Sequence, residues 1–199
     1  MTEKTATRGL IIEAVIDCIE KYGIEKVTTR RIAEQAGTNI ASINYYFRSK
    51  DELVAAALTL TINHMLEDVE AILADPNEPY QTILETFFLY LLDGVMRFPG
   101  VSIAHLYSSI MDKQYDTPGG RGIVKAFNLL VERTAREYPD HNKEELQLLL
   151  SQIMYSIMFN MLAPNFLPVE QQYQLTSSAN AKNLAGYYTK ISLRMMEKN

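Results

Sequence analysis

The sequence predicts an all-α fold in which a small N-terminal domain of three helices is joined to a larger helical domain. Apolar residues recur at the three-to-four-residue spacing of helices along most of the chain. Proline and glycine interrupt that spacing at short intervals, and no segment alternates apolar and polar residues as a half-buried strand does. With 47% hydrophobic and 22% charged residues, the 199-residue chain can bury the core of one domain or of two small ones.

The first three helices are short and form the predicted small domain. Six apolar residues of the first helix share one face: Ile11, Ala14, Val15, Cys18, Ile19 and Tyr22. Gly23 ends this helix, because glycine accepts the left-handed conformation that commonly follows a helix. Thr28 can cap a second helix that runs to about Ala36, and Gly37 marks a tight turn. A third helix is expected over residues 39–47.

The longer helices follow in a second predicted domain, residues 49–199, after a first domain of residues 1–48. Ser49 and Glu52 have the spacing of a capping box, which starts a helix that extends to about Ala74. Further helices are expected over residues 79–97, 101–112, 121–138, 142–163, 168–176 and 179–197. The glycine-rich run from Pro118 to Gly122 is predicted to be a loop.

Charge is divided unevenly along the chain. The net charge of −5 argues against a protein that binds nucleic acid over its whole surface. Residues 24–50 hold five basic and two acidic side chains, whereas residues 51–199 hold eleven basic and eighteen acidic ones. We call the predicted first domain (residues 1–48) together with residues 49–50 the head, and the rest of the second domain (residues 51–199) the body. A modestly basic head on an acidic body is compatible with phosphate binding by the head alone.

Cysteine usage and hydropathy predict a cytoplasmic protein without membrane association. Cys18 is the single cysteine of the sequence, so no internal disulfide can form, which fits a reducing compartment. The longest early apolar run covers residues 10–12 and is much shorter than the apolar core of a signal peptide. The longest apolar-rich stretch, residues 153–163, is too short to span a bilayer.

Residues 28–47 have the pattern of a helix-turn-helix. Two short helices that cross steeply need a small residue and a sharp turn, which Ala33 and Gly37 supply. The residues expected to pack against the first helix are Ile32, Ala36, Ile40, Ile43 and Phe47. The outward face of the third helix then carries Asn39, Ala41, Ser42, Asn44 and Tyr45. This small, neutral, hydrogen-bonding face suits the major groove of DNA, since helices that only face solvent usually carry Lys and Glu.

The run from about Val27 to Leu53 resembles the DNA-binding signature of the TetR family of transcriptional regulators. The matching features come in order: a Thr-capped helix, an Ala-Gly turn, a recognition helix, a Tyr-Phe pair and a Lys-Asp-Glu-Leu helix start. One departure is Asn44, where family members often carry an aromatic residue. The resemblance implies a homodimer that binds a palindromic operator in double-stranded DNA, usually as a repressor, and that a small-molecule ligand releases.

Resemblance and polarity together assign residues of the head to DNA. Those expected to hold phosphates and set the register are Thr28, Thr29, Arg30, Tyr46 and Lys50. Those expected to face base edges are Thr38, Asn39, Ser42, Asn44 and Tyr45. The alternative for Arg30, Arg31 and Lys50 is an ordinary solvated charged face. For Tyr46 and Phe47 the alternative is core packing, which we expect for Phe47, whereas Tyr46 should direct its hydroxyl toward the DNA backbone.

The resemblance further implies a cavity for an apolar or amphipathic ligand among the central helices. The residues expected to line it are His64, Met65, Phe88, Tyr90, His105, Tyr107, Phe127, Tyr155 and Phe159, although ordinary core packing is the alternative for each. The helices at 142–163 and 179–197 would pair with their copies as an intermolecular four-helix bundle.

Two other function classes remain open. An α-helical enzyme is disfavoured, because the sequence has no serine-hydrolase, nucleotide-binding or zinc-protease motif, and we expect no catalytic residue, metal or cofactor. The second alternative is a ligand-independent DNA-binding protein whose body recruits a protein partner. A cavity that is closed or filled with side chains would favour that alternative.

Overall fold

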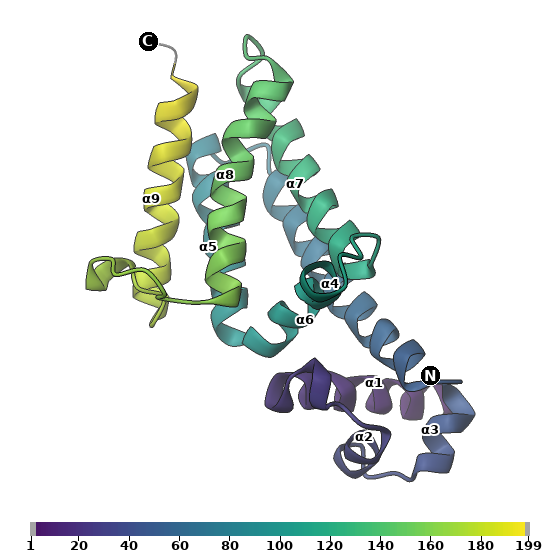
Figure 1. The fold of residues 1–199 in the computed structure, drawn as a ribbon. Helices are drawn as coiled ribbons and strands as arrows, with labels where there is room; N and C mark the ends of the chain where they lie inside the picture. The colour runs from purple at the N-terminus through teal and green to yellow at the C-terminus, as the bar shows by residue number, and fades with distance from the viewer. Residues whose placement is uncertain (1–2, 198–199) are drawn as a thin grey trace. The chain divides into compact units, whose positions relative to one another are not determined.

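The computed structural model describes the backbone of residues 3–197 and the side chains of residues 5–197, and this part of the chain is helical without a β-strand (Figure 1). The predicted all-α fold is therefore confirmed. The short N-terminal elements are α1 (Glu3–Tyr22), the 3-10 turn η1 (Ile24–Lys26), α2 (Thr29–Gln35) and α3 (Ile40–Tyr46). The elements that follow are α4 (Lys50–Ala74), α5 (Tyr80–Arg97), α6 (Pro99–Met111), α7 (Pro118–Glu137), α8 (Lys143–Leu162), the 3-10 turn η2 (Gln171–Tyr173) and α9 (Ser178–Met196).

The chain divides into two compact units, and two helices run through both. The first unit comprises the chain up to residue 64 together with residues 98–122, and the second comprises residues 65–97 and the chain from residue 123 onward. Parts of α4 and α7 therefore belong to each unit. The first unit extends beyond residue 48 and includes α6, while the domain boundary at residue 48 stays a prediction.

The first unit has its own hydrophobic core, built by α1, α2, α3, the start of α4, and α6. The α1 stripe is buried from Ile11 to Ile19, and α6 adds Val101 and Ala104 to the same core. The stripe prediction is wrong at Tyr22, whose side chain is 36% exposed. Tyr22 is the last residue of the helix, and the Arg31 guanidinium lies over its ring, with its carbon 4.7 Å from the ring centroid.

The second unit has a separate core to which α5 contributes most of the large side chains. Phe87, Phe88 and Leu92 of α5 are completely buried there. Helices α5, α8 and α9 contact one another pairwise, and Figure 1 shows them side by side. His141, just before α8, places its Nε2 2.7 Å from the carbonyl oxygen of Met196 at the end of α9. Helices α8 and α9 are therefore antiparallel.

The helix predicted over residues 168–176 is wrong, because only the single turn η2 forms there. In this segment, side chains form hydrogen bonds with backbone groups that would otherwise bond one another in a helix. The Asn165 side-chain oxygen accepts a hydrogen bond from the Leu175 N–H at 2.7 Å. The Asn180 amide donates to the carbonyl oxygens of Gln171 and Gln174, each at 2.9 Å.

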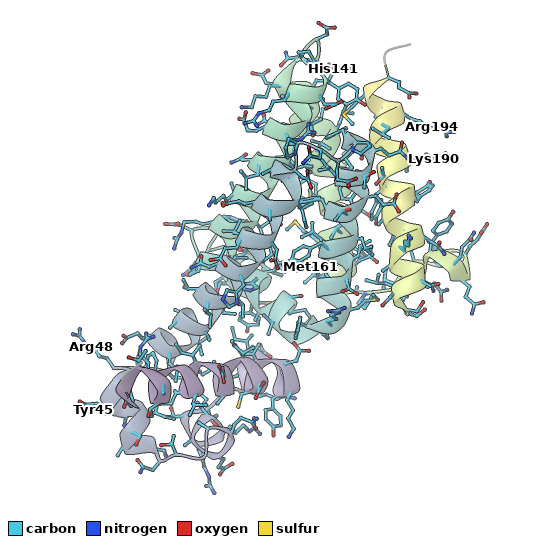
Figure 2. All side chains as sticks on the ribbon, turned by 180° about the vertical axis from the view of Figure 1, so that it is seen from behind. Tyr45, Arg48, His141, Met161, Lys190 and Arg194 are labelled. Atoms are coloured by element: carbon cyan, nitrogen blue, oxygen red, sulfur yellow. The ribbon has the colours of Figure 1, made fainter. Side chains whose placement is uncertain are left out.

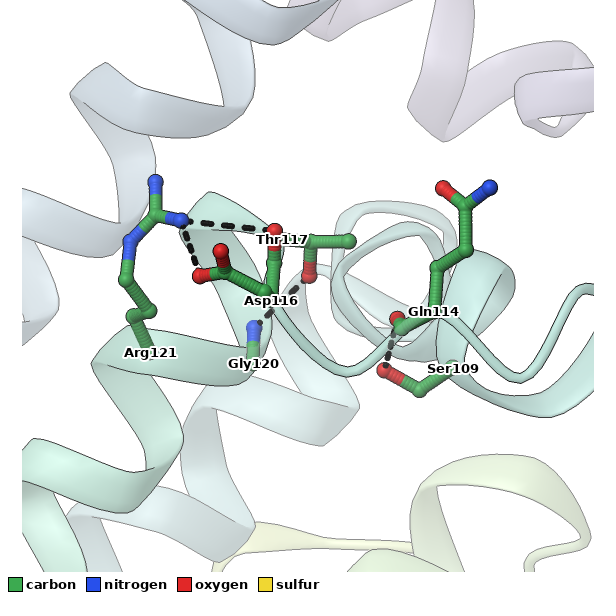
Figure 3. Close-up of polar contacts among 6 residues, drawn as sticks. All are labelled: Ser109, Gln114, Asp116, Thr117, Gly120 and Arg121. Atoms are coloured by element: carbon green, nitrogen blue, oxygen red, sulfur yellow. Dashed lines mark hydrogen bonds and ion pairs between the residues drawn. The ribbon is translucent and has the colours of Figure 1, made fainter.

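The glycine-rich run is also different from its predicted form, since α7 begins at Pro118 and includes the glycines. The Thr117 hydroxyl accepts from the Gly120 N–H at 3.0 Å and so caps the first turn, as Figure 3 shows together with the bonds of the loop before it. A Cβ on Gly119 would lie 2.5 Å from the carbonyl oxygen of His105, and one on Gly122 would overlap the Ile62 side chain. These glycines permit close helix packing within the first unit rather than a loop.

No single helix within the described residues is both long enough and apolar enough to cross a membrane. Helices α5 and α6 reach that threshold only when their lengths are combined.

Candidate nucleic-acid interface

Helix α2 and the turn after it are fixed by local chemistry. Thr28 caps α2 by accepting a hydrogen bond from the Arg31 N–H at 3.3 Å, as predicted. Ile32 and Ala33 are buried at the crossing with the neighbouring helices. Gly37 then adopts a φ of +62°, in the left-handed region that other residues avoid. The predicted helix-turn-helix is thus formed, with its turn where the sequence places it.

Helix α3 buries one side and exposes the other. Ile43 and Phe47 are each 2% exposed, so the prediction of Phe47 as a core residue is confirmed. Ile40 does not pack beneath the helix as predicted. It is 46% exposed because it is the first helical residue, where the chain leaves the turn, and burial begins one turn later. Ala36, which is also predicted to be a core residue, is partly buried at the end of α2.

The exposed side of α3 carries the residues assigned to base edges. Asn39, Asn44 and Tyr45 are exposed, and Thr38 and Ser42 are partly buried. Tyr45 is 70% exposed, and its ring meets that of Tyr46 edge to face with centroids 5.1 Å apart. These side chains come to one surface through the helical repeat, as the sequence predicts, and their contacts with bases stay predictions.

Asn39 also has a structural role that the helical pattern does not predict. Its side-chain oxygen caps α3 by accepting a hydrogen bond from the Ser42 N–H at 2.9 Å. A bidentate pair with adenine uses both the oxygen and the nitrogen of an Asn side chain. Asn39 would have to give up its cap to form such a pair, whereas Asn44 has no capping role.

The start of α4 is held by a reciprocal pair of bonds. The Ser49 hydroxyl accepts from the Glu52 N–H at 3.1 Å, as predicted for a capping box. The Glu52 carboxylate reaches back to the Arg48 N–H at 3.0 Å, one residue before the cap. The link between α3 and α4 is therefore rigid, and the exposed Lys50 side chain follows it directly.

The cations of the head differ in their surroundings. Arg30 pairs with Glu34 of the same helix at 3.0 Å, and both side chains are largely exposed. Such a surface pair is worth little, so Arg30 can exchange Glu34 for a phosphate at small cost. Arg31 instead donates to the carbonyl oxygen of Lys26 at 2.5 Å and covers Tyr22, which fixes it as a structural residue.

Helix α6 is bonded to the helices of the head within the first unit. Its first amides, those of Gly100 and Val101, donate to the Glu20 carboxylate of α1 at 3.2 and 3.0 Å. A Cβ on Gly100 would lie 2.8 Å from the Glu20 Cα, so only glycine fits this contact. Further along α6, the Tyr107 hydroxyl donates to the Glu25 carboxylate at 2.6 Å. The head and α6 thus share both a core and a set of polar contacts.

The residues predicted to line a ligand cavity are distributed over several environments. In the first unit, His64 is exposed, while His105 and Tyr107 are partly buried on α6. In the second unit, Phe88 is fully buried, and Met65, Tyr90 and Phe127 are partly buried against the same core. Tyr155 and Phe159 are 67% and 47% exposed on α8. A ligand role for any of them stays a prediction.

An apolar surface remains exposed on α8 and α9, the helices predicted to pair with a second copy. Its members are Leu148, Tyr155, Phe159 and Leu162 on α8, and Tyr187 and Met195 on α9. Below this surface the Tyr188 hydroxyl bonds the Ser156 hydroxyl at 2.7 Å and the Asn160 amide at 3.4 Å.

Comparison with known sequences gives one family. Residues 11–57 match the family model of bacterial regulatory proteins, tetR family. The HTH-type transcriptional regulator BetI of Brucella canis (strain ATCC 23365 / NCTC 10854 / RM-666) is 32% identical over 76 residues, which cover 38% of this chain and 38% of that protein. The chain therefore matches well under half of the length of this curated relative.

Comparison with solved structures extends over nearly the whole chain. A tetR-family transcriptional regulator from Streptomyces coelicolor superposes with a TM-score of 0.70 at 13% identity, covering 96% of this chain and 80% of that one. A TetR-like transcriptional regulator from Rhodococcus sp. RHA1 superposes with a TM-score of 0.68 at 16% identity, covering 98% and 99%. At these identities the similarity establishes a shared fold.

Proposed function

We propose that the chain belongs to the tetR family of bacterial regulatory proteins, whose family model matches residues 11–57, and that it is a transcriptional repressor that binds a palindromic operator as a homodimer and leaves it when a small molecule binds. It acts in the cytoplasm, where the operator DNA is, and we assign it no catalytic role.

The exposed face of α3 is the observation that carries this proposal. Asn44 and Tyr45 project from a helix whose other side is buried through Ile43 and whose start is capped by Asn39. Their side chains therefore approach a partner from a fixed backbone. Amide and hydroxyl groups on a rigid helix can read the donor and acceptor pattern of the major groove.

Phosphate contacts would surround this face. Thr28 and Thr29 lie at the N-terminus of α2, where the helix dipole favours an anion. Arg30 follows on the same helix, while Tyr46 ends α3 and Lys50 begins α4. Contacts of this kind set the register of the protein on DNA and carry no sequence information.

Dimerisation would bury the apolar surface of α8 and α9. Tyr155 and Phe159 expose large apolar areas that a second copy can cover, and a two-fold interface uses the same surface on both chains. In such a dimer two recognition helices bind successive major grooves about 34–36 Å apart. This is why we propose a palindromic operator.

Release of the operator DNA would depend on the distance between the two recognition helices of the dimer. A ligand can release DNA only if it binds the DNA-competent and incompetent states with different affinities. Helix α4 starts directly after the recognition helix and continues into the second unit, so a shift of its far end can tilt the head. A change of a few Å in the spacing of the heads would weaken binding without touching a base contact.

The experiment is selection of duplexes from a random DNA library by the wild-type protein. We expect a palindrome whose half-sites are about one helical turn apart. In the Asn44→Ala variant, the preference at one position of each half-site should relax by about 1–3 kcal/mol, with other positions unchanged. Failure to enrich any duplex would reject the proposal, and an unchanged preference would remove Asn44 from the base-reading set.

The second candidate is a protein that recruits a protein partner instead of sensing a ligand. A cavity filled with side chains would favour it, and the position of Phe88 is an observation of this kind. This predicted cavity residue is completely buried and packs edge to face on Tyr188, with ring centroids 6.0 Å apart. Thermal unfolding across a metabolite panel separates the candidates, because a ligand that binds the folded state raises the melting temperature.

A further inference from the structure

Three cations of the head, Arg8, Arg48 and Lys50, are exposed and have no acidic partner among the described residues. They differ in this from Arg30 and Arg31, which are engaged by Glu34 and by a backbone carbonyl. An exposed cation without a carboxylate partner keeps its full charge available to an incoming anion. All three are therefore candidate anion-binding residues.

Arg8 makes a contact that its place in the sequence does not suggest. Its guanidinium carbon lies 4.9 Å from the centroid of the Phe47 ring. Phe47 is 2% exposed, so the ring is immobile and offers a fixed platform for the cation. Contact with a ring leaves the five N–H donors of an arginine without an acceptor of their own, and a phosphate can supply one.

Arg48 follows Phe47 directly and projects from the same rigid link. Its backbone N–H is already bonded to Glu52, so the main chain is fixed while the side chain remains exposed. Figure 2 shows Arg48 and Tyr45 projecting from the same edge of the head. Arg48 thus borders the exposed face of α3, and Arg8 lies over the ring of the preceding residue, Phe47.

We propose that Arg8 and Arg48 form a second phosphate-binding site, which holds the DNA backbone next to the phosphate assigned to Lys50. This inference rests on the proposed function and extends it in one respect: α1 takes part in DNA binding, beyond the helix-turn-helix itself. The site binds phosphate regardless of sequence, because guanidinium groups that pair with phosphates do not read base edges.

The size of the effect follows from counterion release. Each phosphate contact adds about 0.9 to the slope of log affinity against log salt. A dimer would lose two contacts in the Arg8→Ala variant, and therefore about 1.8 of slope. The affinity ratio of wild type to variant should then shrink about tenfold between 50 and 200 mM salt.

The test uses a duplex selected from a random library by the wild-type protein and measures its affinity over that salt range. Arg8→Ala and Arg48→Ala should each flatten the slope while the selected sequence stays the same. Arg8→Lys should restore most of the slope, because it keeps the charge. Lys21→Ala, an exposed cation at the opposite end of α1, is the matched control and should leave the slope unchanged.

Different failures lead to different conclusions. If no duplex is enriched, the proposed function and this site are both rejected. If wild type binds, and Lys50→Ala flattens the slope while Arg8→Ala and Arg48→Ala do not, the second site alone is rejected. An equal loss of slope in Lys21→Ala would mean that net charge acts without a site, which also overturns the proposal.

Discussion

His105 should cost the protein stability in mild acid, because burial keeps its imidazole neutral. Its Nε2 lies 3.0 Å from the Thr61 hydroxyl, which can itself donate to the Leu58 carbonyl oxygen at 3.1 Å. The imidazole then donates from Nε2, and Nδ1 is left buried without a partner. Protonation would place a charge there with no acceptor, so burial lowers the pKa of His105 to about 4.

The size of the penalty follows from the difference in pKa between the two states. In the unfolded chain a histidine has a pKa of about 6.5. As the pH falls below that value, the unfolded state gains a proton that the folded state refuses, and stability decreases until the folded pKa is reached. The loss attributable to His105 is near zero at pH 7.5 and amounts to about 2.5 kcal/mol at pH 4.5.

Urea unfolding at both pH values measures this loss. His105→Gln keeps a donor for Thr61 but cannot be protonated, so its stability relative to wild type should improve by about 2.5 kcal/mol on going from pH 7.5 to pH 4.5. His64→Gln, which removes an exposed histidine, is the control and should follow wild type. If wild type and His105→Gln lose stability in parallel, His105 is not held neutral by burial and the reasoning fails.

Three further predictions concern packing, assembly and release. Gly119→Ala should destabilise the protein by about 1–3 kcal/mol in urea unfolding, since its Cβ would meet the His105 carbonyl oxygen, whereas Gly186→Ala, with open space around it, should be neutral or stabilising. Phe159→Glu should weaken self-association by about a hundredfold or more in sedimentation and leave the fold intact, because the side chain is 47% exposed; an unchanged dimer would remove this residue from the interface. Spin labels on the exposed Lys26 of both heads should report a changed distance when a DNA-releasing ligand binds, and an unchanged distribution would favour direct competition between ligand and DNA.

Features that depend on a few consecutive residues could be predicted from the sequence. The cap at Thr28, the left-handed Gly37 and the capping box at Ser49 each follow from the local chemistry of one side chain or one backbone angle. The burial of Phe47 follows from helical periodicity. These signals are sufficient for the predicted caps, for the turn of the helix-turn-helix and for most helix boundaries.

Features that depend on contacts between residues far apart in the sequence could not be predicted in this way. The glycines at the start of α7 resemble a loop locally, and only the approach of His105 and Ile62 shows why glycine is needed in a helix. The segment before α9 has helical periodicity, yet the Asn165 and Asn180 side chains satisfy its backbone in another way. The contact of Arg8 with Phe47 likewise leaves no trace in either local sequence.

The shared core of the head and α6 affects when the head can fold during synthesis of the chain. The ribosome delivers α1, α2 and α3 first, but Val101 and Ala104 complete the core that these helices enclose. The helix-turn-helix therefore cannot reach its final packing until about half of the polypeptide has emerged, and until then its apolar faces are open to the chaperones that bind nascent chains. The proposed DNA-binding surface would therefore reach its final form only after α6 has been synthesised.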